Sequence, residues 1–274
     1  MHGKPRMDLG QLTDDALTGG FRLWQRRRGH RYSLDDVLTA YVALQALPAP
    51  LRCLDLGCGI GSVLLMLAYK LPHATLCGIE AQAQSKLLAS RNVDRNGVGQ
   101  RVSLIEGDFR QPQVRAEGLY DLVTGTPPYQ PLGAGTLSPD SQRAHARVEL
   151  RGGVEDYLAV AARYLVPAGR FVVCADARTP QRVERGAKVA GLHVHAVCHA
   201  QPAEHKAALF SVWTLGCAPV TNVEESLFVA RTAQGQRTAH YQAVRQFFDL
   251  SKTQDESASP PVRLRTASSV KVVR

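Results

Sequence analysis

The sequence has no feature that would place the protein in a membrane or outside the cell. No apolar run approaches the roughly 18 to 20 residues that a helix needs to cross a bilayer. The N-terminus, MHGKPRMDLGQLTDD, is polar and lacks the apolar centre of a secretory signal. The sequence also contains no internal repeat. We therefore expect a soluble, cytoplasmic protein with no membrane partner.

Metal-binding patterns are also absent from the sequence. The six cysteines never occur in Cys-x-x-Cys spacing, and most stand in apolar runs where buried thiols are ordinary. Four histidines are close in sequence (His193, His195, His199 and His205) but do not follow the spacing of metal ligands. The sequence predicts reduced thiols and no metal site. The cysteines are Cys53, Cys58, Cys77, Cys174, Cys198 and Cys217.

The chain does contain a regular alternation of strand-like and helix-like segments. This pattern is typical of an α/β fold in which helices cover both faces of a mostly parallel sheet. The 274 residues, 45% of them hydrophobic, can form a sizeable core. A short polar loop joins the last two expected strands, so we predict that they pair antiparallel. The expected strands are 51–57, 74–80, 101–108, 120–125, 168–177, 192–201 and 206–216, and the expected helices are 61–71, 83–96, 154–166 and 179–191.

A glycine-rich turn follows the first expected strand. The segment LDLGCGIG, residues 54–61, contains Gly57, Gly59 and Gly61. Glycine has no Cβ, so the backbone can turn sharply and lie against a ligand, while the next helix offers free N–H groups. A dinucleotide fingerprint would need glycine at position 62, where Ser62 stands. The turn therefore predicts a nucleotide-type site that lacks the dinucleotide fingerprint.

Acidic residues end the next two expected strands. Glu80 ends the second strand, and Asp108, followed by Phe109, ends the third. Ligands of open α/β sheets bind at the carboxyl ends of the strands, so these residues and the glycine turn should share one edge. An ionised carboxylate only accepts hydrogen bonds, and Glu80 therefore suits a pair of hydroxyl groups.

Together these residues resemble the cofactor site of class I methyltransferases that use S-adenosylmethionine. The resemblance implies a Rossmann-like sheet of seven strands with an antiparallel last strand, and S-adenosylhomocysteine as the product. It implies that Glu80 binds both ribose hydroxyls, that Asp108 accepts a hydrogen bond from the adenine amino group, and that Phe109 packs on the adenine. It also places Asp55 near the methionine ammonium of the cofactor. The loop against the cofactor would be formed by Gly57, Cys58, Gly59 and Gly61.

The fourth expected strand ends in the tetrapeptide Thr126-Pro127-Pro128-Tyr129. Adjacent prolines stop a strand because neither has an N–H to donate. The tetrapeptide resembles the Asn-Pro-Pro-Tyr motif of amino-methyltransferases that act on adenine, cytosine or glutamine. The resemblance implies that the carbonyl of Pro127 accepts an N–H of the substrate and that Tyr129 stacks on its planar group. Thr126 replaces the asparagine, and its shorter hydroxyl cannot pair an acceptor with a donor as an amide does.

The N-terminal stretch narrows the resemblance. LTDDALTGGFRLWQRRRGHRYSLDDVLTAYVA resembles the start of bacterial methyltransferases that modify N6 of the adenine beside the anticodon of a valine tRNA. The likeness covers roughly residues 11–217. It implies a tRNA or another structured RNA as the partner, and by their position Tyr32 and Asp35 are candidate cofactor contacts.

A basic cluster surrounds Trp24 in the same stretch. The formal net charge is +9, and basic residues with an interleaved aromatic suit a phosphate backbone. A solvated arginine-rich segment is the alternative interpretation. The predicted nucleic-acid contacts are Arg22, Arg26, Arg27, Arg28 and Arg31.

We predict four regions along the chain. They are a basic N-terminal segment leading into the cofactor site (1–50), a methyltransferase domain (51–217), a C-terminal extension (218–250) and a disordered tail (251–274). Within the extension, residues 225–231 read as an extra strand and 238–250 as a terminal helix.

Three functions fit these observations. The first is N6-methylation of an adenine in tRNA. The second is methylation of another nitrogen, in a protein side chain or a small molecule, which the threonine at position 126 suggests. The third is binding of RNA or a partner by a protein that has the cofactor fold but little catalysis.

Overall fold

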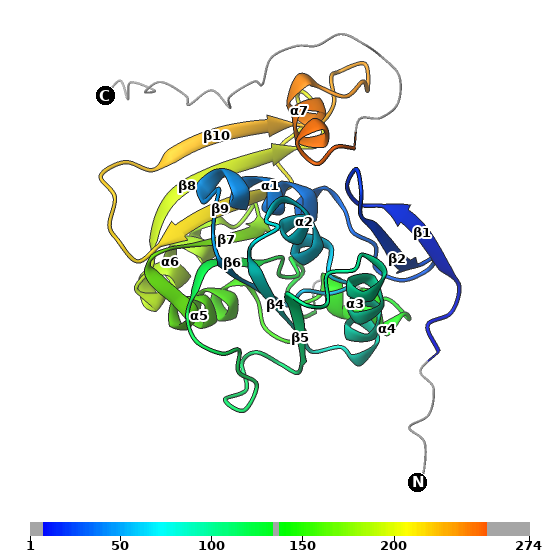
Figure 1. The fold of residues 1–274 in the computed structure, drawn as a ribbon. Helices are drawn as coiled ribbons and strands as arrows, with labels where there is room; N and C mark the ends of the chain where they lie inside the picture. The colour runs from blue at the N-terminus through cyan, green and yellow to red at the C-terminus, as the bar shows by residue number, and fades with distance from the viewer. Residues whose placement is uncertain (1–7, 134–136, 251–274) are drawn as a thin grey trace.

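An eight-stranded sheet with helices on both faces forms the centre of the protein (Figure 1). The computed structural model describes residues 8–133 and 137–250. The strands lie in the order β10-β8-β9-β7-β6-β3-β4-β5. Their bounds are β3 Arg52–Leu56, β4 Thr75–Glu80, β5 Val102–Glu106, β6 Tyr120–Gly125, β7 Leu165–Asp176, β8 His193–Gln201, β9 Phe210–Gly216 and β10 Glu224–Val229.

Most neighbouring strands of the sheet are parallel. The strand β9 is the exception, because it runs antiparallel to both β7 and β8. This arrangement confirms the predicted α/β fold and the antiparallel pairing of its last two expected strands. The carboxyl ends of β3, β4, β5 and β6 consequently meet at one edge.

Two hydrophobic clusters fill the two faces of the sheet. Successive side chains of a strand point to opposite faces of the sheet. Val172 and Cys174 of β7 therefore belong to one cluster, and Phe171 and Val173 belong to the other. The first cluster is covered by α1, α2, α3 and α7, and the second by α5 and α6. The helix bounds are α1 Leu34–Ala46, α2 Ser62–Lys70, α3 Ala83–Arg95, α4 Ser141–Arg147, α5 Val154–Tyr164, α6 Pro180–Ala190 and α7 Ala239–Phe247.

The C-terminal extension adds an eighth strand to the seven that the sequence resemblance implies. This strand, β10, pairs in parallel with β8, which would otherwise present an unpaired edge. Phe228 of β10 is fully buried and packs beside Tyr241 of α7. The expected extra strand and terminal helix are both present, and they complete one end of the sheet. The predicted tail, residues 251–274, lies outside the described residues.

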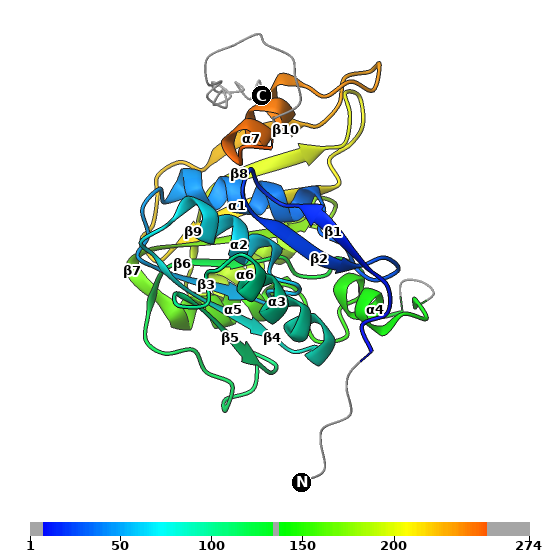
Figure 2. The ribbon, with the colours of Figure 1, turned by 45° about the vertical axis from the view of Figure 1, so that its right-hand side comes forward.

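A β-hairpin, which the sequence analysis did not predict, occupies the basic N-terminal segment. It is formed by β1 (Leu12–Ala16) and β2 (Arg22–Arg26) and lies against α3 and α4 (Figure 2). Asn92 of α3 holds it through both polar atoms of its side-chain amide. Its Oδ1 accepts from the Trp24 N–H at 2.7 Å, and its Nδ2 donates to the Trp24 carbonyl at 3.1 Å. These two hydrogen bonds therefore fix β2 against α3.

Candidate active site

The glycine turn joins β3 to α2 in a conformation that only glycine adopts easily. Gly57, Gly59 and Gly61 all have left-handed φ angles, of 64°, 56° and 87°. A Cβ on Gly57 would lie 2.4 Å from the Tyr157 hydroxyl oxygen, whereas one on Gly59 would meet no atom within 4 Å. The turn is thus packed against α5 on one side and open on the other.

Glu80 at the end of β4 fixes this turn. Its Oε2 accepts the Gly59 N–H at 2.8 Å and its Oε1 accepts the Gln82 N–H at 2.7 Å. Burial raises the pKa of the Glu80 carboxyl, although these two backbone hydrogen bonds and the charge of Arg151 oppose the rise. Glu80 is 8% exposed and lines a cavity.

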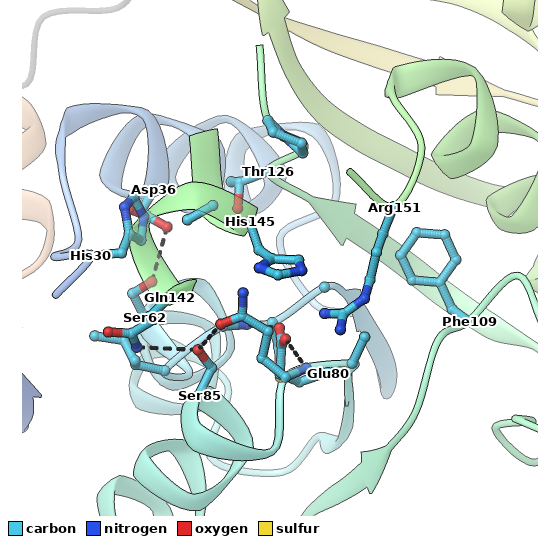
Figure 3. Close-up of a pocket in the computed structure, with 18 of the residues that line it drawn as sticks. His30, Asp36, Ser62, Glu80, Ser85, Phe109, Thr126, Gln142, His145 and Arg151 are labelled. Carbon is cyan, nitrogen blue, oxygen red and sulfur yellow. Dashed lines mark hydrogen bonds between the residues drawn. The ribbon is translucent and has the colours of Figure 1, made fainter. Parts of the chain in front are cut away.

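We call this first cavity the glycine-loop cavity (Figure 3). It brings together most of the cofactor contacts that the sequence resemblance implies. Three of the expected contacts, Asp35, Asp55 and Gly61, do not line it, and Gly61 instead caps α2. The expected contacts that line it are Tyr32, Gly57, Cys58, Gly59, Glu80, Asp108 and Phe109.

The Asp108 and Phe109 pair stands at one end of this cavity. The Asp108 carboxylate is bound by the Arg110 guanidinium at 2.6 Å, and this hydrogen bonding lowers the pKa of Asp108. Phe109 packs edge-on against Tyr157, with ring centroids 4.7 Å apart. Arg151 also points into the cavity between Phe109 and Glu80, a position that the sequence did not indicate (Figure 3).

Asp55 lies behind the cavity instead of lining it. It is 2% exposed, and its Oδ1 accepts a hydrogen bond from the Thr124 hydroxyl of β6 at 2.8 Å. Burial raises the pKa of Asp55 from 3.8 to about 7. The same effect, together with the charge of Asp35, raises the pKa of Asp36 to about 7.

These raised pKa values predict that stability falls as the pH rises. The folded-state pKa lies above the unfolded one. The stabilising free energy that each group contributes is therefore complete below about pH 4, and it is lost as the pH rises through about 7. For each group the loss between pH 6 and 8 should be about 1 kcal/mol. In urea unfolding at these two pH values, Asp55→Asn should remove about half of the loss, and Asp121→Asn, at the other end of β6, should leave it intact. Equal losses in the unsubstituted protein and Asp55→Asn would contradict the assignment.

A second cavity, of about 800 Å³, adjoins the first. We call it the proline cavity, because all of Thr126-Pro127-Pro128-Tyr129 lines it. The Tyr129 hydroxyl lies 2.9 Å from Cys174 Sγ and donates to Asp35 Oδ2 at 3.2 Å. Burial raises the pKa of Tyr129, so the phenol remains protonated. The Tyr129 ring is therefore anchored in the wall of this cavity.

The two cavities meet along a small set of residues that line both. We call these the junction residues. Thr126 and Pro128 are two of them, so the head of the tetrapeptide borders both cavities. The complete set is His30, Tyr32, Asp36, Thr126, Pro128 and Ala146.

A short helix, α4, covers the glycine-loop cavity from the connection that follows β6. Its Gln142 and His145 line the cavity, and Gln142 Nε2 donates to Ser85 Oγ at 3.1 Å. Arg26 of the hairpin forms a 2.8 Å ion pair with Asp140, which caps the helix. The helix α4 was not predicted, because its residues show neither a long apolar period nor a strand pattern.

The predicted arginine cluster is largely engaged within the protein. Arg22 pairs with Asp14 and Arg31 with Asp15, each at 2.9 Å, and Arg26 is held by Asp140. Arg27 and Arg28 are exposed. Of the five, only Arg31 lines the proline cavity, where Arg143, Arg147 and Arg178 join it from other elements.

Comparison with known proteins identifies the family. Residues 36–184, more than half of the chain, match the methyltransferase small domain. The chain belongs to this family. The match confirms the resemblance seen in the sequence and, with it, the class of S-adenosylmethionine-dependent methyltransferases.

Relatives within the family have different substrates. A release factor glutamine methyltransferase of Geobacter sulfurreducens is 34% identical over 138 residues, 48% of this chain and 47% of that protein. A tRNA1(Val) (adenine(37)-N6)-methyltransferase of Bacteroides fragilis is 30% identical over 154 residues, 56% of this chain and 63% of that protein. The protein of the same name from Vibrio cholerae is 27% identical and covers 80% of this chain. This chain thus spans less than two thirds of the first two relatives.

A solved structure shares the fold. The crystal structure of a predicted O-methyltransferase from Agrobacterium tumefaciens superposes with a TM-score of 0.56, over 78% of this chain and 96% of that one, at 18% identity. This protein and the A. tumefaciens protein therefore share the fold described above. Within the described residues, no helix is long and apolar enough to cross a membrane, and no three His, Cys, Asp or Glu side chains are grouped as metal ligands.

Proposed function

We propose that this protein transfers a methyl group from S-adenosylmethionine to N6 of an adenine in tRNA. The observation that carries the proposal is the position of Thr126 and Pro128, which line both cavities. A methyl group bound in the glycine-loop cavity and a nitrogen bound in the proline cavity would meet at these residues. The adenine-N6 relatives from B. fragilis and V. cholerae support this choice of nitrogen. A tRNA substrate would place the activity in the cytoplasm.

The lining of the glycine-loop cavity fits S-adenosylmethionine. A Cβ at Gly59 would project into open space, so the backbone there leaves room for a ligand to lie against it. The Glu80 oxygens each accept one backbone N–H and retain lone pairs for the ribose hydroxyls. Phe109 offers an aromatic ring for the adenine. When bound, the cofactor supplies an activated methyl group whose leaving group is a neutral sulfide.

The tetrapeptide would hold the acceptor nitrogen in line with that methyl group. Two prolines restrict the backbone, and the anchored Tyr129 hydroxyl restricts its ring, so the wall of the proline cavity is rigid. A planar base can stack on such a ring. Alignment of the nitrogen with the methyl group converts two separate reactants into one oriented complex. This orientation provides much of the rate acceleration.

Arginines around the proline cavity support an RNA substrate. Arg147 is exposed, and Arg178 is 78% exposed while its guanidinium is held by Asp176 at 2.6 Å. Arg143 donates to the Gly29 carbonyl at 3.3 Å and so lies close to the hairpin. Guanidinium groups at the mouth of a base-sized cavity can bind the phosphates that flank a base turned out of its stack.

We expect Arg147→Ala to weaken binding of an adenine-bearing anticodon stem-loop several-fold at low salt. The loss of one phosphate contact should also reduce the slope of log affinity against log salt by about one. Titration by fluorescence anisotropy at several salt concentrations measures both effects. Arg163→Ala is the matched control, because Arg163 is exposed at the end of α5 and lines neither cavity. Identical slopes for the two variants would count against a phosphate contact at Arg147.

A glutamine side chain in a protein is the second candidate acceptor. Two observations favour it: the relative that modifies release factors, and the threonine that stands where the amino-methyltransferase motif has asparagine. Transfer of a labelled methyl group into bulk tRNA and bulk protein, followed by mass spectrometry of the product, separates the candidates. N6-methyladenosine in the tRNA supports the proposal, and label found only in protein overturns it.

A further inference from the structure

Because Thr126 stands where the related motif has asparagine, the site lacks the side-chain amide that would accept one N–H of the acceptor nitrogen. An adenine amino group carries two N–H bonds, and in the related motif a side-chain amide and a proline carbonyl accept them. When such a nitrogen forms its bond to a methyl group it becomes positively charged and must release a proton. A threonine hydroxyl is shorter than the amide and reaches less far toward the second N–H. Neither a hydroxyl nor an amide takes up a proton at neutral pH, so a group near the junction that both accepts the N–H and takes the proton would serve the reaction.

The junction contains one imidazole and one carboxylate among the described residues, those of His30 and Asp36. Both line the glycine-loop cavity as well as the proline cavity, and Figure 3 draws them at the same end of the first. The Asp36 oxygens already have donors, because Oδ2 accepts the Ser33 N–H and Oδ1 accepts the Ser62 hydroxyl, each at 2.9 Å. Asp36 is therefore held in place at both oxygens, and its raised pKa leaves much of it protonated near neutral pH.

His30, by contrast, makes no hydrogen bond within the described part of the chain. Burial lowers the pKa of its imidazole below 6.5, and the charges of Arg143 and Arg147 on α4 act in the same direction. The charge of Asp35 on α1 opposes them. The ring is therefore neutral near pH 7, and a neutral imidazole always has one nitrogen that accepts.

The other ionisable side chains near the junction are less suited to the task. Burial raises the pKa of the third titratable junction residue, Tyr32, and its hydroxyl donates to the Ala16 carbonyl at 2.7 Å. His145 of α4 lines only the glycine-loop cavity, and its Nδ1 lies 2.9 Å from the Ser141 carbonyl. Neither presents a free acceptor to both cavities.

We propose that His30 accepts the second N–H of the acceptor nitrogen and takes its proton during methyl transfer. This inference rests on the proposed function. The nitrogen lone pair forms the new N–C bond, and the electrons of the broken C–S bond remain on sulfur. The N–H proton passes to the free nitrogen of the imidazole, and the imidazolium then returns it to water through the proline cavity. His30 is thus a catalytic residue: it accepts the N–H that asparagine accepts in the related motif, and it also takes the proton.

The test is the pH dependence of a single turnover on an adenine-bearing anticodon stem-loop with saturating S-adenosylmethionine. The unsubstituted protein should lose rate at acid pH, below the ordinary histidine pKa of 6.5, because protonated imidazole cannot accept. His30→Asn should lower the rate at pH 7.5 about 100-fold and remove this acid limb. His30→Gln, with a longer amide, should behave in the same way. His73→Asn, at an exposed histidine remote from both cavities, should change neither.

A second substitution separates catalysis from misfolding. Thr126→Asn introduced into His30→Asn should restore about tenfold of the rate, because an amide oxygen then accepts the second N–H, while the proton is lost to water. Calorimetric affinity for S-adenosylmethionine should stay within about threefold in every variant that folds. An unchanged acid limb in His30→Asn and His30→Gln overturns this inference alone. Absence of methyl transfer to RNA by the unsubstituted protein overturns the proposed function as well.

Discussion

Glu80→Ala is expected to weaken S-adenosylmethionine binding about 100-fold in a calorimetric titration. The Glu80 carboxylate holds the Gly59 and Gln82 amides while it lines the glycine-loop cavity. Hydrogen bonds to a charged group contribute about 1.5 to 3 kcal/mol each, so losing the proposed ribose contacts together with the support of the turn accounts for such a factor. The effect should appear in the dissociation constant and in the shift of the melting temperature that the ligand produces.

The neighbouring strand offers a matched control for this substitution. Glu106 of β5 lies directly opposite Glu80 in the sheet register but is exposed and does not line the cavity. Glu106→Ala should change the affinity less than about twofold, because an exposed strand-end carboxylate contributes little. Similar affinities for Glu80→Ala and Glu106→Ala would exclude the assigned role of Glu80.

We expect Gly57→Ala to destabilise the protein by about 3 kcal/mol. An alanine in the left-handed region costs about 1 to 2 kcal/mol, and its Cβ would lie 2.4 Å from the hydroxyl oxygen of the buried Tyr157. Displacing that ring adds an overpacking cost of about 1 to 3 kcal/mol. Urea unfolding at constant pH measures the total, and cofactor binding should be lost with it because the turn moves.

Gly59→Ala separates backbone strain from crowding. Gly59 has a similar φ angle of 56°, but a Cβ there would meet no atom within 4 Å. The loss of stability should therefore be about 1 kcal/mol, while the affinity for S-adenosylmethionine falls because the methyl group projects toward the cavity. If Gly57→Ala were no more destabilising than Gly59→Ala, the close packing of the turn on Tyr157 would be refuted.

The local order of the sequence determined much of the cofactor half of the site. The glycine turn, Glu80 and Phe109 each follow a strand directly, and parallel strands bring their carboxyl ends to one edge. The head of the tetrapeptide, Thr126, reaches the same edge for the same reason. A local sequence pattern is sufficient to predict these positions, because the parallel sheet brings the ends of the strands together. Asp55 shows the limit, since its side chain faces Thr124 instead of the cavity.

Tertiary structure alone decided which charged and polar side chains are available for chemistry. Arg26 is 58 residues from Gln84 in the chain and 114 from Asp140, yet it binds both and so helps to hold α4 over the cavity. Asp36 is engaged by Ser62, whereas His30, which lines the same two cavities, makes no hydrogen bond within the described residues. A side chain's partners depend on contacts between segments that are distant in the sequence, so a local pattern of residues cannot predict them. The sequence by itself therefore determined the fold class and the cofactor edge, and the packing of the hairpin and α4 against that edge decided the rest of the site.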